Sequence, residues 1–148
     1  MKRHIALRPL SRDHHQALVI ARRLRHANRD TAAETAAAFL QFWHTHGLRH
    51  FREEEEILLP AYAEHGDPEH PLVARVLVDH VVIRRGARRL ETAGAASPAD
   101  LRELGERLTD HVRLEERQLF PLIEEAMPAE AATALAEALA ETEGAPPA

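Results

Sequence analysis

Hydrophobic residues recur every three or four positions along most of the chain, and polar residues occupy the positions between them. This period is typical of helices that bury one face. Glycine, proline and small polar residues interrupt the pattern at four places, so the sequence predicts five helices. Their expected ranges are 10–27, 31–66, 71–94 and 98–127, followed by a short alanine-rich helix over 129–142.

Short sequence signals mark where these helices are expected to begin or bend. Ser11 or Asp13 would open the first helix, and Thr31 has capping-box spacing with the glutamate three residues on. Pro71 suits the first turn of the third helix, and a serine followed by proline opens the fourth. Pro60 predicts a kink or an early end in the second helix. Short connections between long helices predict an all-α, up-down-up-down four-helix bundle with a short extra C-terminal helix.

The length and composition of the chain fit a single all-helical domain. Its 148 residues are enough to bury a core without covalent support. We expect that core over about 10–127, the extra helix over about 129–142 and a flexible tail over 143–148. Aromatic residues make up only 4% of the chain and β-branched runs are scarce, which disfavours a β-sandwich or a β-barrel.

Charge and cysteine content exclude several classes of function. The formal net charge of -5 argues against a surface built for nucleic acid, and we interpret the arginine-rich segment 84–89 as a solvated helix face. No apolar run is long enough to cross a membrane, and a secretory hydrophobic segment is not apparent at the N-terminus. The lack of cysteine excludes disulfides, thiolate metal sites and iron–sulfur clusters. We therefore expect a cytoplasmic monomer or homodimer with no nucleic-acid and no membrane partner.

An internal repeat links the second and fourth predicted helices. Residues 50–64 align with residues 111–125 at a constant offset of 61, and seven of the fifteen positions are identical. Both copies contain a histidine followed by a glutamate four residues later, which places the two side chains on one face of a helix. The other two long helices share a fainter echo, an aspartate followed by a histidine at positions 13–14 and 79–80.

The four histidines of these segments are expected at one height in the bundle. Counted along the helices from the connecting loops, their levels agree within about six residues, or roughly 9 Å. In the first helix His14 shares the apolar stripe that faces the core, whereas His15 lies on a mixed face. We favour His14 and keep His15 as a substitute. We read His4, His26, His44, His65 and His70 as surface histidines, and Glu53, Glu55 and Glu56 as a solvated helix face.

Imidazoles and carboxylates that converge in an apolar interior need partners, and metal ions would provide them. Nitrogen and oxygen ligands without thiolate suit iron, manganese or zinc. Four histidines and two glutamates fit two octahedral ions about 3.5 Å apart, bridged by the glutamates. Two carboxylates cancel only part of the ionic charge, so we also expect an oxo or hydroxo bridge. The candidate ligands are His14, His50, Glu54, His80, His111 and Glu115.

These residues resemble those of the hemerythrin-like (HHE cation-binding) family. The resemblance rests on the segments 13–15, 50–55, 79–80 and 111–116 and spans roughly residues 10–127. It implies a four-helix bundle that holds a non-haem di-iron centre, with the four histidines as terminal ligands and the two glutamates as bridges. Oxygen-carrying hemerythrins place another histidine four residues after the one on the third helix, where this chain has Arg84. His46 or His15 would be the substitutes, and Arg84 would alternatively hold an anion or a bound ligand.

Three functions share this predicted centre. The first is a binding protein for dioxygen or nitric oxide that serves in sensing, storage or scavenging. The second is an enzyme, either a di-iron oxidase, a peroxidase-like protein or a nitric-oxide-detoxifying one. The third is iron handling without gas chemistry. The sequence lacks a nucleophile triad, a glycine-rich phosphate loop and a dinucleotide fingerprint, and we therefore favour the binding protein.

Overall fold

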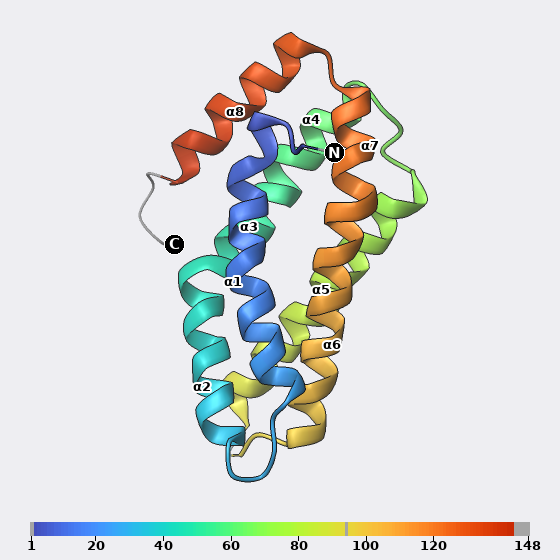
Figure 1. Ribbon diagram of the computed structural model, residues 1–148. Coiled ribbons are helices and arrows are strands. Elements are labelled where there is room, and N and C mark those ends of the chain that lie inside the picture. Colours follow the sequence, from blue (N-terminus) through green and yellow to red (C-terminus); the bar gives the residue numbers. More distant parts are fainter. Residues whose placement is uncertain (1, 94, 144–148) are drawn as a thin grey trace.

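The computed structural model describes residues 2–93 and 95–143, and every regular element within these residues is helical (Figure 1). Here η1 is a 3-10 turn, and η2, η3 and η4 are π-helical turns. In chain order the elements are η1 (Ile5–Leu7), α1 (Arg8–Arg25), α2 (Ala32–Phe42), η2 (Trp43–Gly47), α3 (Leu48–Glu53), η3 (Glu54–Leu58), α4 (Leu59–Ala63), α5 (Pro71–Thr92), α6 (Pro98–Leu114), η4 (Glu115–Leu119), α7 (Phe120–Ala126) and α8 (Ala129–Glu143).

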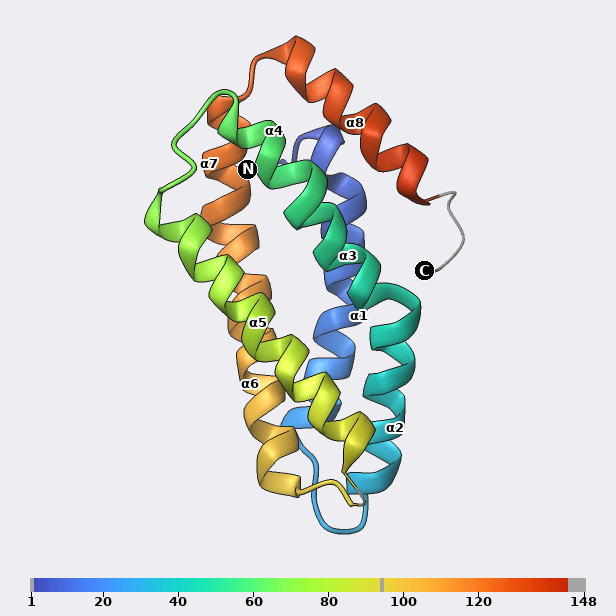
Figure 2. The same ribbon diagram turned by 180° about the vertical axis from the view of Figure 1, so that it is seen from behind.

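The prediction of five helices is confirmed. Because the π turns join their neighbours without a break, α2 to α4 form one helix and α6 to α7 form another. α1, α2–α4, α5 and α6–α7 lie side by side as a bundle, and α8 crosses one end of it (Figures 1 and 2). The sequence predicts the tail over 143–148, but α8 extends to Glu143, and 144–148 fall outside the described residues. None of the helices in the described part of the chain is long and apolar enough to cross a membrane.

One predicted helix start and one predicted helix cap are wrong in detail. α1 begins at Arg8 rather than at Ser11 or Asp13, because proline in its first turn lacks an N–H group and needs no cap there. The preceding turn is capped by His4, whose Nδ1 accepts from the Ala6 N–H at 3.0 Å. The side chain of Thr31 makes no cap on α2, since its hydroxyl oxygen accepts from the Asn28 N–H instead.

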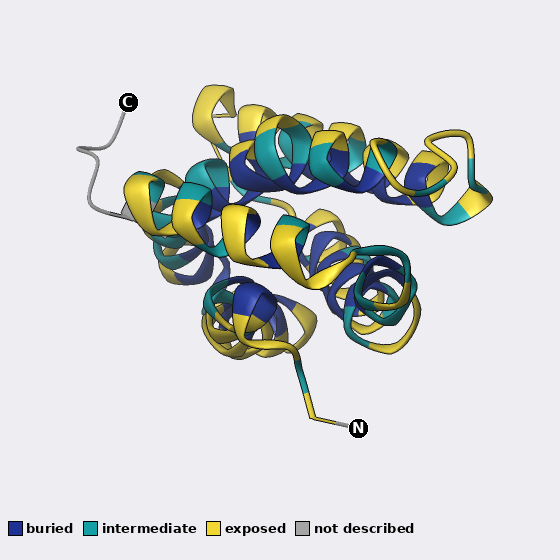
Figure 3. Cartoon of the chain, turned by 90° about the horizontal axis from the view of Figure 1, so that it is seen from above, coloured by how far each residue is buried: buried dark blue, intermediate teal, exposed yellow. Residues whose placement is uncertain are grey.

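The interior contains two apolar clusters with a polar layer between them. One cluster lies among the four long helices in the half of the bundle away from α8, around Phe39, Trp43 and Leu108 (Figure 1). The other lies at the end that α8 covers, where Leu135 and Leu139 of α8 pack against Tyr62 and neighbouring side chains. Viewed along the bundle, buried segments face inward and exposed segments face outward (Figure 3). The polar layer contains the six candidate metal ligands predicted from the sequence.

The two π turns η3 and η4 occupy equivalent places in the sequence repeat. Each ends two residues before a proline, Pro60 or Pro121. Proline has no N–H group and its ring clashes with the carbonyl four residues back in a regular α-helix. In the π turn the Leu59 N–H donates to the Glu54 carbonyl, five residues back, and η4 does the same from Phe120 to Glu115. The wider turn lets each helix continue past its proline, and both π turns begin at a glutamate of the site.

Candidate metal centre

Six side chains from four helices meet in the polar layer between the apolar clusters. All six are buried, and the most accessible of them, His50, is only 6% exposed. We call them the inner set. They are His14 of α1, His50 of α3, Glu54 of η3, His80 of α5, His111 of α6 and Glu115 of η4.

Each glutamate of the inner set lies between two histidines. Oε1 of Glu54 lies 2.9 Å from Nε2 of His80, and its Oε2 lies 3.2 Å from Nε2 of His50. Oε1 of Glu115 lies 2.9 Å from Nε2 of His14, and its Oε2 lies 3.4 Å from Nε2 of His111. All four histidines therefore direct the same ring nitrogen toward the two carboxylates.

The inner set divides into two groups with the composition of metal sites. In each group, one nitrogen or oxygen atom from every residue lies within 4.8 Å of the others. One group contains His14 and His50, and the other contains His80 and His111. Glu54 and Glu115 belong to both groups. Two neighbouring cations that share two carboxylates would satisfy this arrangement.

Several buried atoms of the inner set lack a hydrogen-bond partner among the described residues. They are Nε2 of His50, Nε2 of His111, Oε2 of Glu54 and Oε2 of Glu115. Burial of an unpaired polar atom costs free energy, and native interiors rarely contain several such atoms together. Here they gather at one point and are all possible metal-ligand atoms. The residues present therefore fit bound cations.

A carboxylate outside the inner set holds the other nitrogen of every histidine. Because a carboxylate only accepts hydrogen bonds, each Nδ1 carries a proton, and Nε2 is the nitrogen that would lose its proton and offer a lone pair to a bound cation. We call these four residues the outer carboxylates. Their oxygens contact Nδ1 at 3.0 Å for Asp13 and His50, 2.6 Å for Glu55 and His80, 3.1 Å for Asp79 and His111, and 3.1 Å for Glu116 and His14.

These contacts repeat in the two halves of the chain. His14 of α1 contacts two successive glutamates, 115 and 116, on the fourth long helix. His80 of α5 likewise contacts two successive glutamates, 54 and 55, on the second long helix. The aspartate before each of these histidines holds the histidine of the neighbouring long helix, as Asp13 holds His50. The repeat in the sequence thus corresponds to a two-fold relation within the site.

Charges within the site stabilise one another against the cost of burial. Burial opposes protonation of His80, but hydrogen bonds with Glu54 and Glu55 raise its pKa from 6.5 to about 9. Burial also opposes protonation of His50, yet the Glu54 charge and the hydrogen bond with Asp13 raise its pKa well above the usual value. Burial alone would raise the pKa of Glu54, but the His50 charge holds it well below its usual range. The carboxylates therefore favour positive charge at the centre, from protons or from metal ions.

Residues 6–123 match the family described as the hemerythrin HHE cation binding domain. The chain belongs to this family. No match was found among curated proteins or among solved structures. The family description agrees with the two metal-type groups of the inner set, and the matched residues include the whole inner set and every outer carboxylate.

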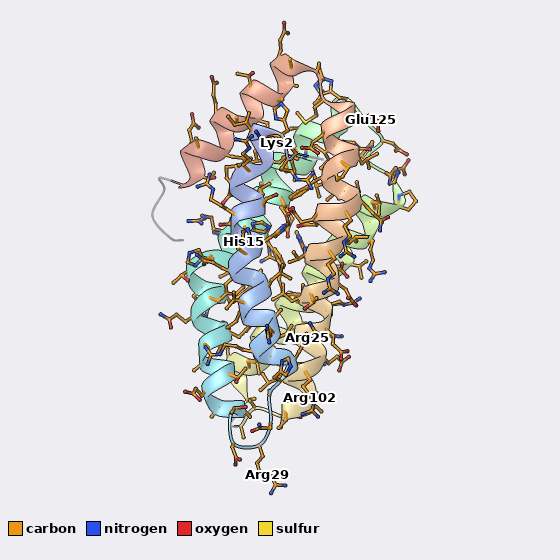
Figure 4. The ribbon with its side chains drawn as sticks, in the orientation of Figure 1. Lys2, His15, Arg25, Arg29, Arg102 and Glu125 are labelled. Atoms are coloured by element: carbon orange, nitrogen blue, oxygen red, sulfur yellow. The ribbon has the colours of Figure 1, made fainter. Side chains whose placement is uncertain are left out.

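The two substitute ligands lie outside the inner set of this hemerythrin-like domain. His15 is exposed on the outer side of α1, away from the centre (Figure 4). His46 hydrogen-bonds the Thr45 hydroxyl through Nδ1 and stacks on Phe42. Arg84 does not reach the inner set either. Its Nη2 donates to Glu55 at 3.0 Å, and its guanidinium lies over the ring of Phe51.

The expectation of a solvated glutamate face is wrong for two of its three residues. Glu53 is only 3% exposed and lies 3.2 Å from Nε of Arg49. Glu55 is an outer carboxylate, whereas Glu56 is exposed as expected. A local signal for the outer carboxylates does exist, because each of them is the immediate sequence neighbour of an inner-set residue. The pattern of hydrophobic residues alone could not show which neighbour turns inward.

An apolar pocket reaches the centre beside α2 and η2. Its walls are mainly apolar and include Phe39, Trp43 and Leu108, although Asp13 and His46 also line it. The inner-set histidines His14, His50 and His111 line it as well. His80 is covered instead by Phe51, whose ring stacks on the imidazole with centroids 3.8 Å apart. The pocket therefore gives access to the centre mainly on the side of α1 and α3.

Proposed function

We propose that this hemerythrin-like domain holds two iron ions and binds dioxygen or nitric oxide at them. The observation that carries the proposal is that Glu54 and Glu115 each belong to both metal-type groups. One ion would lie between these carboxylates and the pair His14 and His50, and the other between them and the pair on α5 and α6. The two glutamates would bridge the ions, and the four imidazoles would be terminal ligands through Nε2.

The donor set supports iron as the metal. Imidazole nitrogens and carboxylate oxygens without thiolate suit iron, with manganese and zinc as the alternatives. Two carboxylates cancel only part of the charge of two ions, so we include an oxo or hydroxo bridge in the proposed cofactor. The outer carboxylates keep the four Nδ1 protons in place, which orients the imidazoles before any metal binds.

The shape and polarity of the pocket support a small uncharged ligand. Most of its walls are apolar, which favours a small uncharged gas over a larger polar metabolite, because most of the surface of a polar ligand would lose its water without gaining partners. When bound, ferrous ions supply the electrons and the open coordination position that dioxygen or nitric oxide requires. The protein's part is to exclude water and to hold the imidazoles and carboxylates in place.

The proposal also includes the order of the helices, the cellular location and the oligomeric state. We retain the up-down-up-down order of the four long helices within one domain, which is supported by the position of successive helix ends at opposite ends of the bundle (Figures 1 and 2). A cytoplasmic location and a monomeric or homodimeric state remain predictions from the sequence.

Iron loading under anaerobic conditions tests the proposal directly. We expect two irons per chain and an absorption change that dioxygen or nitric oxide causes and that removal of the gas reverses. Glu54→Gln should lose at least half of the iron, whereas Glu56→Gln, exposed two residues further on, should retain it. A wild-type chain that binds no iron, or equal iron in both variants, would refute the centre. Irreversible oxidation with continued turnover would show an enzyme instead.

A further inference from the structure

A second cavity lies between the C-terminal half of α5 and the N-terminal half of α6. Its volume is about 220 Å³. Neither the inner set nor the outer carboxylates contribute to its lining. Apolar side chains including Val82, Leu90 and Leu104 form part of its wall. The helices approach closely here, since a Cβ on Gly86 would lie 2.9 Å from Cδ1 of Leu104.

Three arginines line the same cavity. Arg85 and Arg89 stand one turn apart on α5, so their positive charges repel each other. Neither forms an ion pair with any residue in the described part of the chain. Arg107 of α6 is held in place by an ion pair in which its Nη1 lies 3.3 Å from Oδ1 of Asp79. The arginine-rich segment that the metal centre does not use therefore faces a cavity.

Acidic side chains in the cavity do not pair with Arg85 or Arg89. Asp100 and Glu103 also line the cavity, but no nitrogen of an arginine lies within 4.0 Å of either carboxylate in the described residues. Because Arg107 is already paired with Asp79, the cavity contains two guanidinium groups and two carboxylates that have no close partner among the described residues. An anion between Arg85 and Arg89 would relieve their repulsion.

We propose that this cavity binds a small organic anion, a carboxylate with an apolar body. A guanidinium presents parallel N–H groups that match a carboxylate, and such charge-assisted hydrogen bonds are the strong ones. The apolar wall would cover the body of the ligand, as in other small-molecule sites. The chemistry differs from that of the metal centre, whose pocket favours an uncharged ligand.

Calorimetric titration of the full chain with benzoate tests this proposal, with benzamide as the neutral molecule of the same shape. We expect benzoate to bind at least about tenfold more tightly than benzamide, because only benzoate forms charge-assisted hydrogen bonds. Arg89→Ala and Arg85→Ala should each weaken benzoate about tenfold. Arg88→Ala, an exposed arginine on the same helix outside the cavity lining, should change the affinity less than twofold.

Three results would overturn the organic-anion site. The first is equal binding of benzoate and benzamide, which would leave the arginines no role. The second is an equal effect of Arg88→Ala and Arg89→Ala on the affinity for benzoate. An equal loss in both would indicate diffuse attraction to a basic surface, and no loss in either would indicate that benzoate binds elsewhere, for example to a metal ion. The third is inorganic phosphate binding as tightly as benzoate, because the apolar wall would then contribute nothing. Circular dichroism of each variant checks that its helices are intact.

Discussion

Raising the pH from 6.5 to 9 should destabilise the metal-free protein. The pKa of the His80 imidazole is about 9 in the folded chain, against 6.5 for an ordinary histidine. A raised pKa means that the folded state binds the proton more tightly than the unfolded state does. The resulting stability is fully present below pH 6.5 and is lost as the pH rises through 9.

The size of this effect follows from the difference between the two pKa values. At about 1.4 kcal/mol for each pKa unit, the change from 6.5 to about 9 corresponds to about 3 kcal/mol of unfolding free energy. The pKa values of His14 and His50 are raised as well, so their contributions have the same sign. The pKa of Glu54 is lowered, which places its titration below this pH window. A loss of 3 kcal/mol is large, because domains unfold with only about 5–15 kcal/mol.

Urea unfolding in the presence of a chelator, at pH 6.5 and at pH 9, measures the loss. His80→Gln should reduce the difference between the two pH values by about 3 kcal/mol and leave the part that His14 and His50 contribute, whereas His44→Gln, at an exposed ion pair with Glu91, should preserve all of it. With Zn²⁺ bound the dependence should reverse, since the metal competes with protons for Nε2 and binds more tightly as the pH rises. A metal-free protein whose stability is constant or increases over this range would refute the reasoning.

Two substitutions test the packing and the outer carboxylates. Gly105→Ala should lower the free energy of unfolding by about 1–3 kcal/mol, because the new Cβ would lie 2.8 Å from backbone atoms of α1, which cannot move away easily. Gly86→Ala is the control, since its new Cβ would meet only the end of a leucine side chain and should cost less. Thermal unfolding measures both variants. Asp79→Asn should weaken metal binding about 10- to 100-fold in competition with a chelator, because it loosens the hold on His111. Unchanged metal affinity would contradict that role.

The helices and the inner set were predictable because their signals are local. Periodic hydrophobic residues with proline and glycine at the boundaries defined the five helical stretches. The repeat of histidine and glutamate four residues apart singled out positions 50, 54, 111 and 115. Helix height and the apolar stripe then favoured His14 over His15, and the structure places His14 in the inner set and His15 on the outside.

The contacts between helices were not predictable from those signals. A glutamate in a run of four looks solvated by composition, yet Glu55 turns toward His80 and Glu53 is buried near Arg49. The π turns also escaped prediction, since proline indicated a kink or a helix end. Their hydrogen bonds depend on the carbonyl five residues back, and no propensity of a single residue reports this register.

The two halves of the site are related in geometry but differ in the charges behind them. Glu55 accepts from Arg84 at 3.0 Å, and Asp79 lies 3.2 Å from Arg75 and 3.3 Å from Arg107. These are the outer carboxylates of His80 and His111.

The corresponding carboxylates of the other half have weaker cationic partners. Glu116 accepts from the neutral hydroxyl of Ser11 at 2.8 Å, and its contact with Arg3 is 4.0 Å. Asp13 lies 3.9 Å from Arg49. An arginine on an outer carboxylate reduces the pull of that carboxylate on the imidazole proton and adds positive charge near the ion, and both effects weaken the hold on a cation. If the proposed pair of ions binds, we therefore expect the position between His14 and His50 to be the tighter one, although the inner ligands of the two positions are the same in kind.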